Sequence, residues 1–182
     1  LAGNVDGNLI NRNGGDVDVT GSMILGGNLT NQAVLDVTGL GTVMTVTGTG
    51  SNSLGGALTI ADGSELSLGT LVNTGGGSVA TVNGTLTGDT TNLDGGQLIV
   101  NTGGTVTGAV RNSADFELAG GAAGSLVNLD GTSDITASGT VDGTTRVDAG
   151  IVTNTDGTLT GLSTVNGGTL TNAATMGDAQ VN

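Results

Sequence analysis

Apolar and small polar residues alternate along most of the chain, in runs of only three to six residues. Clear examples are residues 43–47, 66–68 and 105–107. A period of two is typical of half-buried β-strands. Each run is followed by Gly, Asn-Gly, Asp-Gly or Gly-Gly, which supply the positive φ angles that turns need. The pattern predicts many short strands separated by tight turns, and the frequent glycines disfavour helices.

Two short units recur along the chain. One is Gly-Thr followed by Leu or Val, at residues 41–43, 69–71, 84–86, 104–106, 139–141, 157–159 and 168–170. The other is an aliphatic residue, Thr or Val, and then Asn, ending at Asn31, Asn73, Asn101, Asn128, Asn154 and Asn172. Successive units are often roughly 18 to 28 residues apart, a period that indicates a solenoid of stacked repeats.

Counting strands and turns gives the expected geometry. Three strands and three turns need about 18 to 22 residues, so the chain makes roughly eight to ten coils and a rod of around 40 to 50 Å. We therefore predict an all-β, single-stranded parallel β-helix (β-solenoid), right-handed, with residues 1–182 forming one continuous segment without caps. The alternative is an antiparallel sandwich or barrel, which ordinarily has longer strands, more aromatic core residues and less glycine.

Side-chain types fit such a coil. Leu, Val, Ile and Ala are expected to fill its narrow interior, where aromatic rings are too bulky to stack easily, and Phe116 is the only aromatic residue. Thr is expected on the outer faces, because it is β-branched and polar. The recurring Asn is expected at turns, where it tolerates the left-handed conformation and can bond to the Asn of the next coil.

Composition excludes several classes of protein. The chain has 37 glycines but no proline, so it is not collagen. Its mean hydropathy of +0.18 argues against charge-driven disorder. No apolar run approaches the ~18 residues of a membrane span. The net charge is −13 with only three basic residues, so nucleic acid is not an expected partner.

The usual catalytic and ligating residues are missing. The chain has no histidine and no cysteine, which excludes Ser/His/Asp and Cys/His triads and the common zinc, haem and iron–sulfur sites. Carboxylates remain, but no residue is singled out as catalytic, cofactor-binding or metal-ligating. We therefore expect no enzymatic activity, no cofactor and no metal.

The stretches Gly104-Thr-Val-Thr-Gly-Ala-Val-Arg-Asn112 and Val152-Thr-Asn-Thr-Asp-Gly-Thr-Leu-Thr-Gly161 resemble the passenger regions of bacterial type V secreted proteins. That group includes autotransporter and filamentous-haemagglutinin-like adhesins, whose passengers are right-handed parallel β-helices. The resemblance is one of composition and repeat style over essentially the whole chain, with no diagnostic motif. It implies secretion to a bacterial surface and an adhesive or scaffold role, and it carries over no functional residues.

An acidic stretch, Asn13-Gly14-Gly15-Asp16-Val17-Asp18, partly matches the nonapeptide calcium repeat, which needs Gly-Gly-x-Gly-x-Asp in tandem. Only one imperfect copy is present, so we interpret it as a surface turn.

Pairs of threonines two residues apart resemble the flat ladders of some ice-binding solenoids. The pairs are Thr85/Thr87, Thr105/Thr107, Thr158/Thr160 and Thr169/Thr171. The sequence between them, at Ser125-Leu126-Val127 and Thr140-Val141-Asp142, is expected to interrupt any regular array. An ice-binding module therefore remains an alternative only.

A glycan-active, carboxylate-based β-helix enzyme is the other alternative. Asp89, Asp94 and Asp115 could converge with Arg111, but such sites also use basic clusters and aromatic platforms. Here Arg12, Arg111 and Arg146 are scattered and no platform exists. We interpret these carboxylates as solvated turn residues that keep the rod soluble.

Neither end of the chain resembles a polar or helical cap. Reading residues 181–182 into residues 1–4 recreates the pattern of residues 127–132, so we expect the coil to continue in register by covalent repeat or end-to-end stacking. The function predicted from sequence is an extracellular structural or adhesive β-helix in a bacterial surface stalk, filament or matrix fibre. Its expected partners are copies of itself, associated end to end or laterally, and cell surfaces or glycans.

Overall fold

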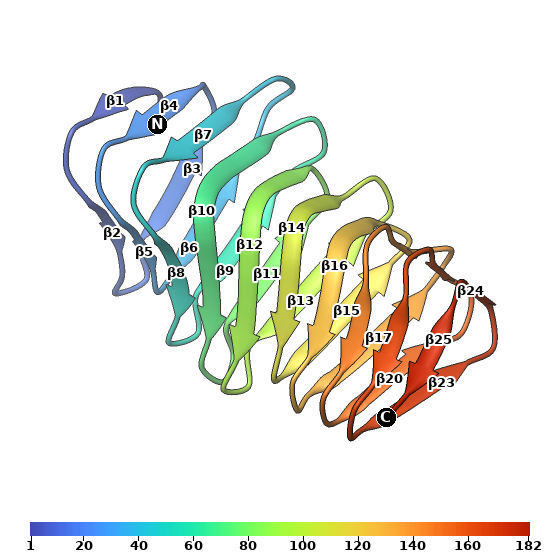
Figure 1. The fold of residues 1–182 in the computed structure, drawn as a ribbon. Helices are drawn as coiled ribbons and strands as arrows, with labels where there is room; N and C mark the ends of the chain where they lie inside the picture. The colour runs from blue at the N-terminus through green and yellow to red at the C-terminus, as the bar shows by residue number, and fades with distance from the viewer.

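The computed structural model describes all 182 residues and contains 25 strands and no helix. Parallel strands stack in about nine turns of roughly 19 residues, which confirms the predicted β-solenoid. Each turn of the solenoid, called a coil below, runs over three faces in the order A, B and C. Faces A and B belong to one 16-stranded sheet and face C is a separate nine-stranded sheet (Figure 1).

The strands of each face follow one another along the axis. Face A consists of β1 (Gly3–Val5), β4 (Met23–Leu25), β7 (Val43–Val46), the first parts of β10 (Glu65–Thr74), β12 (Thr85–Leu93), β14 (Thr105–Asn112) and β16 (Ala122–Asn128), then β18 (Thr140–Val141), β21 (Thr158–Leu159) and β24 (Thr175–Met176). Face B consists of β2 (Leu9–Asn11), β5 (Leu29–Asn31), β8 (Gly50–Ser53), the second parts of β10, β12, β14 and β16, then β19 (Thr145–Val147), β22 (Ser163–Val165) and β25 (Ala179–Val181). Face C consists of β3 (Asp16–Val19), β6 (Val34–Val37), β9 (Ala57–Ile60), β11 (Val79–Val82), β13 (Gln97–Asn101), β15 (Asp115–Ala119), β17 (Thr132–Thr136), β20 (Ile151–Asn154) and β23 (Thr169–Asn172).

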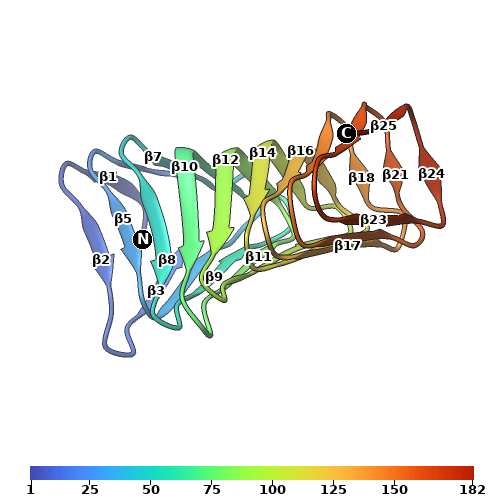
Figure 2. The same cartoon turned by 60° about the horizontal axis from the view of Figure 1, so that its bottom comes forward.

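The solenoid winds right-handed. In Figure 1 the nearer strands run downward and the fainter, more distant strands run back upward, while the chain advances from blue on the left to red on the right. The turned view in Figure 2 shows the coils side by side along the whole chain, from β2 to β24.

In four central coils, faces A and B are joined by one bent strand instead of two short ones. These strands, β10, β12, β14 and β16, have 7 to 10 residues, longer than the alternating runs of three to six residues in the sequence. The bend is absorbed by an irregularity in the ladder, as between Ser67 and Thr70 of β10. Such bulges let a strand turn a corner without losing its pairing on either side.

Side chains that point inward repeat at the same place in successive coils. On face A, Leu66, Leu86, Val106 and Ala123 lie in register and are at most 1 % exposed. A cluster of 29 buried hydrophobic residues fills the interior in this way. Leu, Val, Ile, Ala and Met predominate in it, as the alternating pattern predicts.

Phe116 lies inside the coil and is fully buried on face C. Its register neighbours are Leu98 in one adjacent coil and the small Ser133 in the other. A narrow interior accommodates one aromatic ring where the neighbouring coil supplies a small residue at the same position.

A ladder of buried asparagines runs along the corner between faces B and C. Its members are Asn11, Asn31, Asn52, Asn73, Asn92, Asn112 and Asn128. Each Nδ2 donates to the Oδ1 of the next Asn at 2.8 to 3.1 Å. The predicted coil-to-coil amide bonding is confirmed for Asn31, Asn73 and Asn128.

One detail of that prediction is wrong. None of the ladder asparagines has a positive φ angle, because each one is the last or next-to-last residue of a strand and points inward instead of forming the turn. The predicted bonding is also confirmed for Asn101, in a separate pair: its Nδ2 donates to Asn83 Oδ1, 18 residues earlier, at the corner between faces C and A, where Asn101 is half-buried.

The asparagine ladder changes corner near the C-terminal end. Asn128 is followed in register by Val147, whereas the aliphatic column between faces C and A ends at Ile135 and continues as Asn154 and Asn172. Asn154 Nδ2 donates to Asn172 Oδ1 at 2.6 Å. The amide and the aliphatic side chain have therefore exchanged corners between one coil and the next.

Replacing Asn73 by Ala tests the contribution of the ladder. Asn73 Nδ2 donates to Asn92 Oδ1 and to the Gln97 carbonyl, both at 2.8 Å, and these buried acceptors lose that donor in the variant. We expect N73A to lower the free energy of unfolding by about 2 to 4 kcal/mol, measured by urea denaturation. The matched control is N101A, at a half-buried site with one amide bond, and an equal loss in the two variants would contradict the assignment.

Gly88, at the corner between faces A and B, tests the close approach of neighbouring coils. Its φ is +129°, and a Cβ there would lie 1.9 Å from the Leu68 carbonyl oxygen. We expect Gly88→Ala to destabilise the fold by more than about 3 kcal/mol, because both strain and a backbone clash must be relieved. Gly69→Ala is the control, since its Cβ would meet nothing within 4 Å. An equal fall in the melting temperature of the two variants would contradict this account.

Candidate functional site

The outer surface of face A carries threonines in register. Thr85 aligns with Thr105, and Thr140 aligns with Thr158 and Thr175. The array is interrupted as expected, but at a different place: Ala122 stands beside Thr105, while Ser125 lies on face B. The proposed pair Thr169/Thr171 lies on face C and cannot extend this array.

The carboxylates considered for glycan chemistry do not meet. Asp89 lies at the corner between faces A and B, Asp94 at the corner between B and C, and Asp115 on face C. Each bonds to a neighbouring coil: Asp89 accepts from the Ala109 backbone N–H at 2.9 Å, Asp94 from Thr74 Oγ1 at 3.2 Å and Asp115 from Gln97 Nε2 at 3.1 Å. Arg111, on face B, forms no ion pair with any of them.

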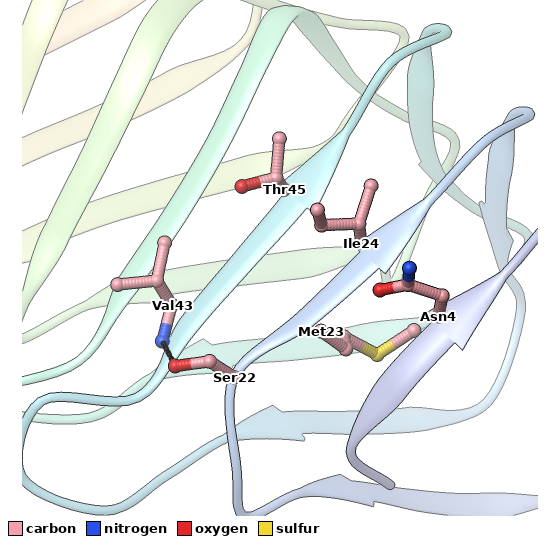
Figure 3. A pocket seen from close by; sticks show the side chains of 6 residues that line it. All are labelled: Asn4, Ser22, Met23, Ile24, Val43 and Thr45. Atoms are coloured by element: carbon pink, nitrogen blue, oxygen red, sulfur yellow. Dashed lines mark hydrogen bonds between the residues drawn. The ribbon is translucent and has the colours of Figure 1, made fainter.

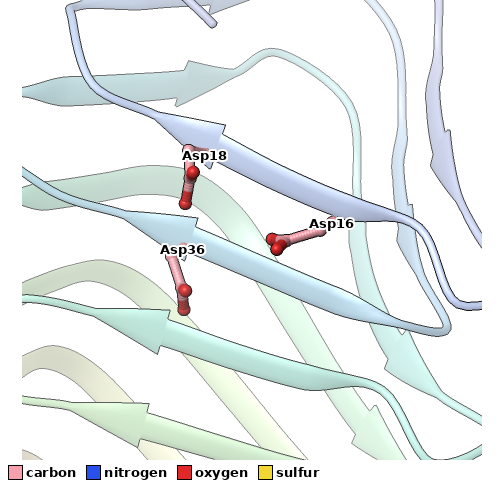
Figure 4. Close-up of side chains that lie close together, drawn as sticks. All are labelled: Asp16, Asp18 and Asp36. Carbon is pink, nitrogen blue, oxygen red and sulfur yellow. The ribbon is translucent and has the colours of Figure 1, made fainter.

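The structure brings together three other carboxylates, those of Asp16, Asp18 and Asp36 (Figure 4). Their oxygen atoms lie within 4.8 Å of one another at the surface of face C. Asp16 and Asp18 belong to the stretch interpreted as a surface turn, but both lie on strand β3. Asp36 comes from the next coil, in register with Asp18, and the sequence motifs do not single it out; its spacing of 18 residues, close to one coil, is the signal that could have found it.

This acidic group could hold a cation only loosely. Calcium prefers six to eight oxygen ligands, and no fourth carboxylate joins the three. Two of the three side chains are exposed, so water would have to complete the coordination shell. The arrangement fits an exchangeable counterion better than a built metal centre.

One shallow hollow lies on face A over the first three coils. It has a volume of about 230 Å³ and is lined by Asn4, Ser22, Met23, Ile24, Val43 and Thr45 (Figure 3). Ser22 Oγ accepts from the Val43 backbone N–H at 3.2 Å, and Ile24 remains 48 % exposed. The lining contains no titratable group, so the hollow offers van der Waals contact to a small apolar group and no acid–base chemistry.

The ion pair of the structure lies at the corner between faces B and C, near the C-terminal end. Arg146 and Asp148 approach to 2.7 Å, and Asn166 Nδ2 donates to Asp148 Oδ1 at 2.7 Å. Asn182 in turn donates to Asn166 Oδ1 at 2.8 Å. This exposed chain of contacts joins three successive coils.

Comparison with models of known protein families, with curated proteins and with solved structures gives no match to this chain. The structure has no helix that could span a membrane.

The Asp148 carboxylate has a pKa below its ordinary value. The hydrogen bond from Asn166 is the main cause; desolvation opposes it by raising the pKa, and the hydrogen bond and charge of Arg146 lower the pKa further. A lowered folded-state pKa stabilises the fold above the unfolded-state pKa, and that contribution is lost as the pH falls through the folded-state pKa.

Asn166→Ala should therefore raise the Asp148 pKa toward its ordinary value, measured by titrating the carboxyl carbon by NMR. Arg146→Gln should also raise it, because the hydrogen bond and the charge of Arg146 both lower the Asp148 pKa. An unchanged Asp148 pKa in Asn166→Ala would contradict the assignment of Asn166 as the main cause.

Proposed function

We propose that this chain is an extracellular structural and adhesive rod, part of a bacterial surface stalk, filament or matrix fibre. The observation that carries the proposal is the combination of unbroken axial ladders with a surface on which no catalytic group converges. The resemblance of its repeats to type V passenger regions supports the extracellular assignment.

Axial cohesion suits such a role. Parallel strand ladders link each coil to the next on all three faces, from β1 to β24 and from β3 to β23. The first coil, for example, cannot leave the rod without breaking the ladders of β1, β2 and β3 and the buried amide contact of Asn11. At about 4.8 Å per coil, the nine turns span about 43 Å.

Surface chemistry is consistent with the same role. The acidic and hydroxyl side chains are spread over all three faces, and the hollow on face A is small and neutral. Such a surface favours many weak contacts with another surface over enclosure of one small molecule.

Display on cells tests the proposal. The 182 residues would be placed between an epitope and an outer-membrane anchor on a bacterial host, with the Gly88→Ala variant displayed at equal epitope density as the matched control. We expect the intact rod to increase cell clumping and retention on surfaces several-fold over the control, because both need a folded, extended surface.

Equal clumping and retention for the two displays would overturn the proposal. Release of reducing sugar ends from polysaccharides by the purified chain would favour the glycan-active alternative instead.

A further inference from the structure

Face C carries two pairs of carboxylates that lie side by side in register. Asp18 aligns with Asp36, called here the first acidic pair, and Glu117 aligns with Asp134, called the second acidic pair. Like charges placed directly opposite each other on adjacent strands are destabilising. Neither pair has a basic partner within the chain, because the ion pair of the structure joins Arg146 to Asp148.

The two acidic pairs are five coils apart. Five ladder steps lead from Asp18 to Glu117, through Asp36, Thr59, Thr81 and Ile99. At about 4.8 Å per step this is about 24 Å along the axis. The positions between them are neutral.

Two of the three arginines have the same separation, on the neighbouring face. Arg12 is exposed in the turn that directly follows face B in the first coil, two residues after Ile10. Five ladder steps lead from Ile10 to Arg111, which is also exposed and unpaired. Each arginine thus lies in the same coil as the start of one acidic pair.

We propose that face C is a docking surface for face B of a second copy of this chain, with the two rods parallel and level. Arg12 of one copy would then face the first acidic pair of the other, and Arg111 would face the second. The chain circulates in the same sense in both rods, so strands of opposed faces run in opposite directions across the contact. That reversal places the Arg111 column opposite the column of Glu117 and Asp134.

The dimensions permit this contact. Opposed sheets pack about 10 Å apart, a gap that an arginine and a carboxylate side chain bridge together. A face about 43 Å long and about 12 Å wide buries about 1,000 Å² in total, at the low end of specific interfaces. The contact is therefore weak, and its charge pairs determine how the two rods align more than how tightly they bind.

This lateral docking rests on the proposed structural role and specifies how the rods pack against one another. A contact between two different faces is heterologous, so each rod keeps one free face B and one free face C. Further copies can join at both sides, and the assembly grows sideways as a raft of level rods. The net charge of −13 opposes this at long range, but at about 0.15 M salt the Debye length of about 8 Å leaves mainly the paired contacts.

Sedimentation velocity of the purified chain at 0.15 M salt tests the contact. We expect concentration-dependent association in the wild type, weakened at least about ten-fold by Arg12→Glu or Arg111→Glu. The matched control is the double variant Thr105→Glu/Thr158→Glu, which also lowers the net charge by two but on the outer side of face A, away from the contact and beside neutral register neighbours. An equal loss in this control, or a wild type that stays monomeric, would overturn the proposal.

Charge exchange gives a second readout. Arg111→Glu and Glu117→Arg should each associate weakly alone and regain wild-type association when mixed, because the two exchanged charges would then face each other across the contact. Both substitutions are on outward positions, and unchanged urea midpoints would show that the fold is retained. Failure of the mixture to associate would overturn the pairing.

Cross-linking tests the orientation of the rods. The chain has no cysteine, so Ser51→Cys on face B and Thr59→Cys on face C provide single thiols in the same coil. We expect a short bis-maleimide to cross-link the two variants when mixed and to link little within either alone, because thiols on sheets about 10 Å apart are too distant for a direct disulfide. Efficient linking of Thr59→Cys to itself would show a two-fold contact instead. Cell clumping in the display assay without these effects would sink the docking geometry and leave the structural role standing.

Discussion

Every coil must place its strands directly above those of the coil before it, and the rest of the structure follows from that registration. The interior is only a few side chains wide, so a slip of one residue would turn a whole apolar set outward. Backbone ladders alone tolerate such slips. The buried asparagines do not, because each amide must find an acceptor on one side and a donor on the other. They stabilise one alignment at the cost of burying polar groups, and each is satisfied by the next coil.

The alignment of the coils also determines which side chains become neighbours on the surface. Positions that are about 19 residues apart in sequence become neighbours at strand spacing, whether or not their chemistry is compatible. Threonines gain a regular row in this way, and asparagines gain partners. Carboxylates do not: Asp18 and Asp36, or Glu117 and Asp134, are held side by side by ladders whose cohesion comes from elsewhere. The surface of such a rod therefore holds like charges side by side, and an external cation or a partner is needed to relieve their repulsion.

Local features of the chain were predictable, and alignments between coils were harder. Alternation and turn residues are encoded within a few positions, so the β-solenoid and its coil length follow from the sequence. The separation of ladder partners, however, varies from 16 residues for Asn112 and Asn128 to 21 for Asn31 and Asn52. With turns of unequal length, the sequence pattern alone places Thr169 in the wrong array and leaves Asp36 unnoticed. A spacing of only 11 residues between Thr158 and Thr169 is already too short for one coil, and that signal is present in the sequence.

The exchange of corners after Asn128 divides the rod into two blocks with different internal patterns. Within the first block every coil offers an amide at the corner between faces B and C, and within the second the amide stands between faces C and A. Duplicating a whole coil inside either block, or deleting one inside the first, leaves the amides matched. Moving a coil from one block into the other sets an asparagine beside an aliphatic side chain on both sides. The rod can therefore change its length by gene duplication within a block, whereas recombination across the boundary is penalised.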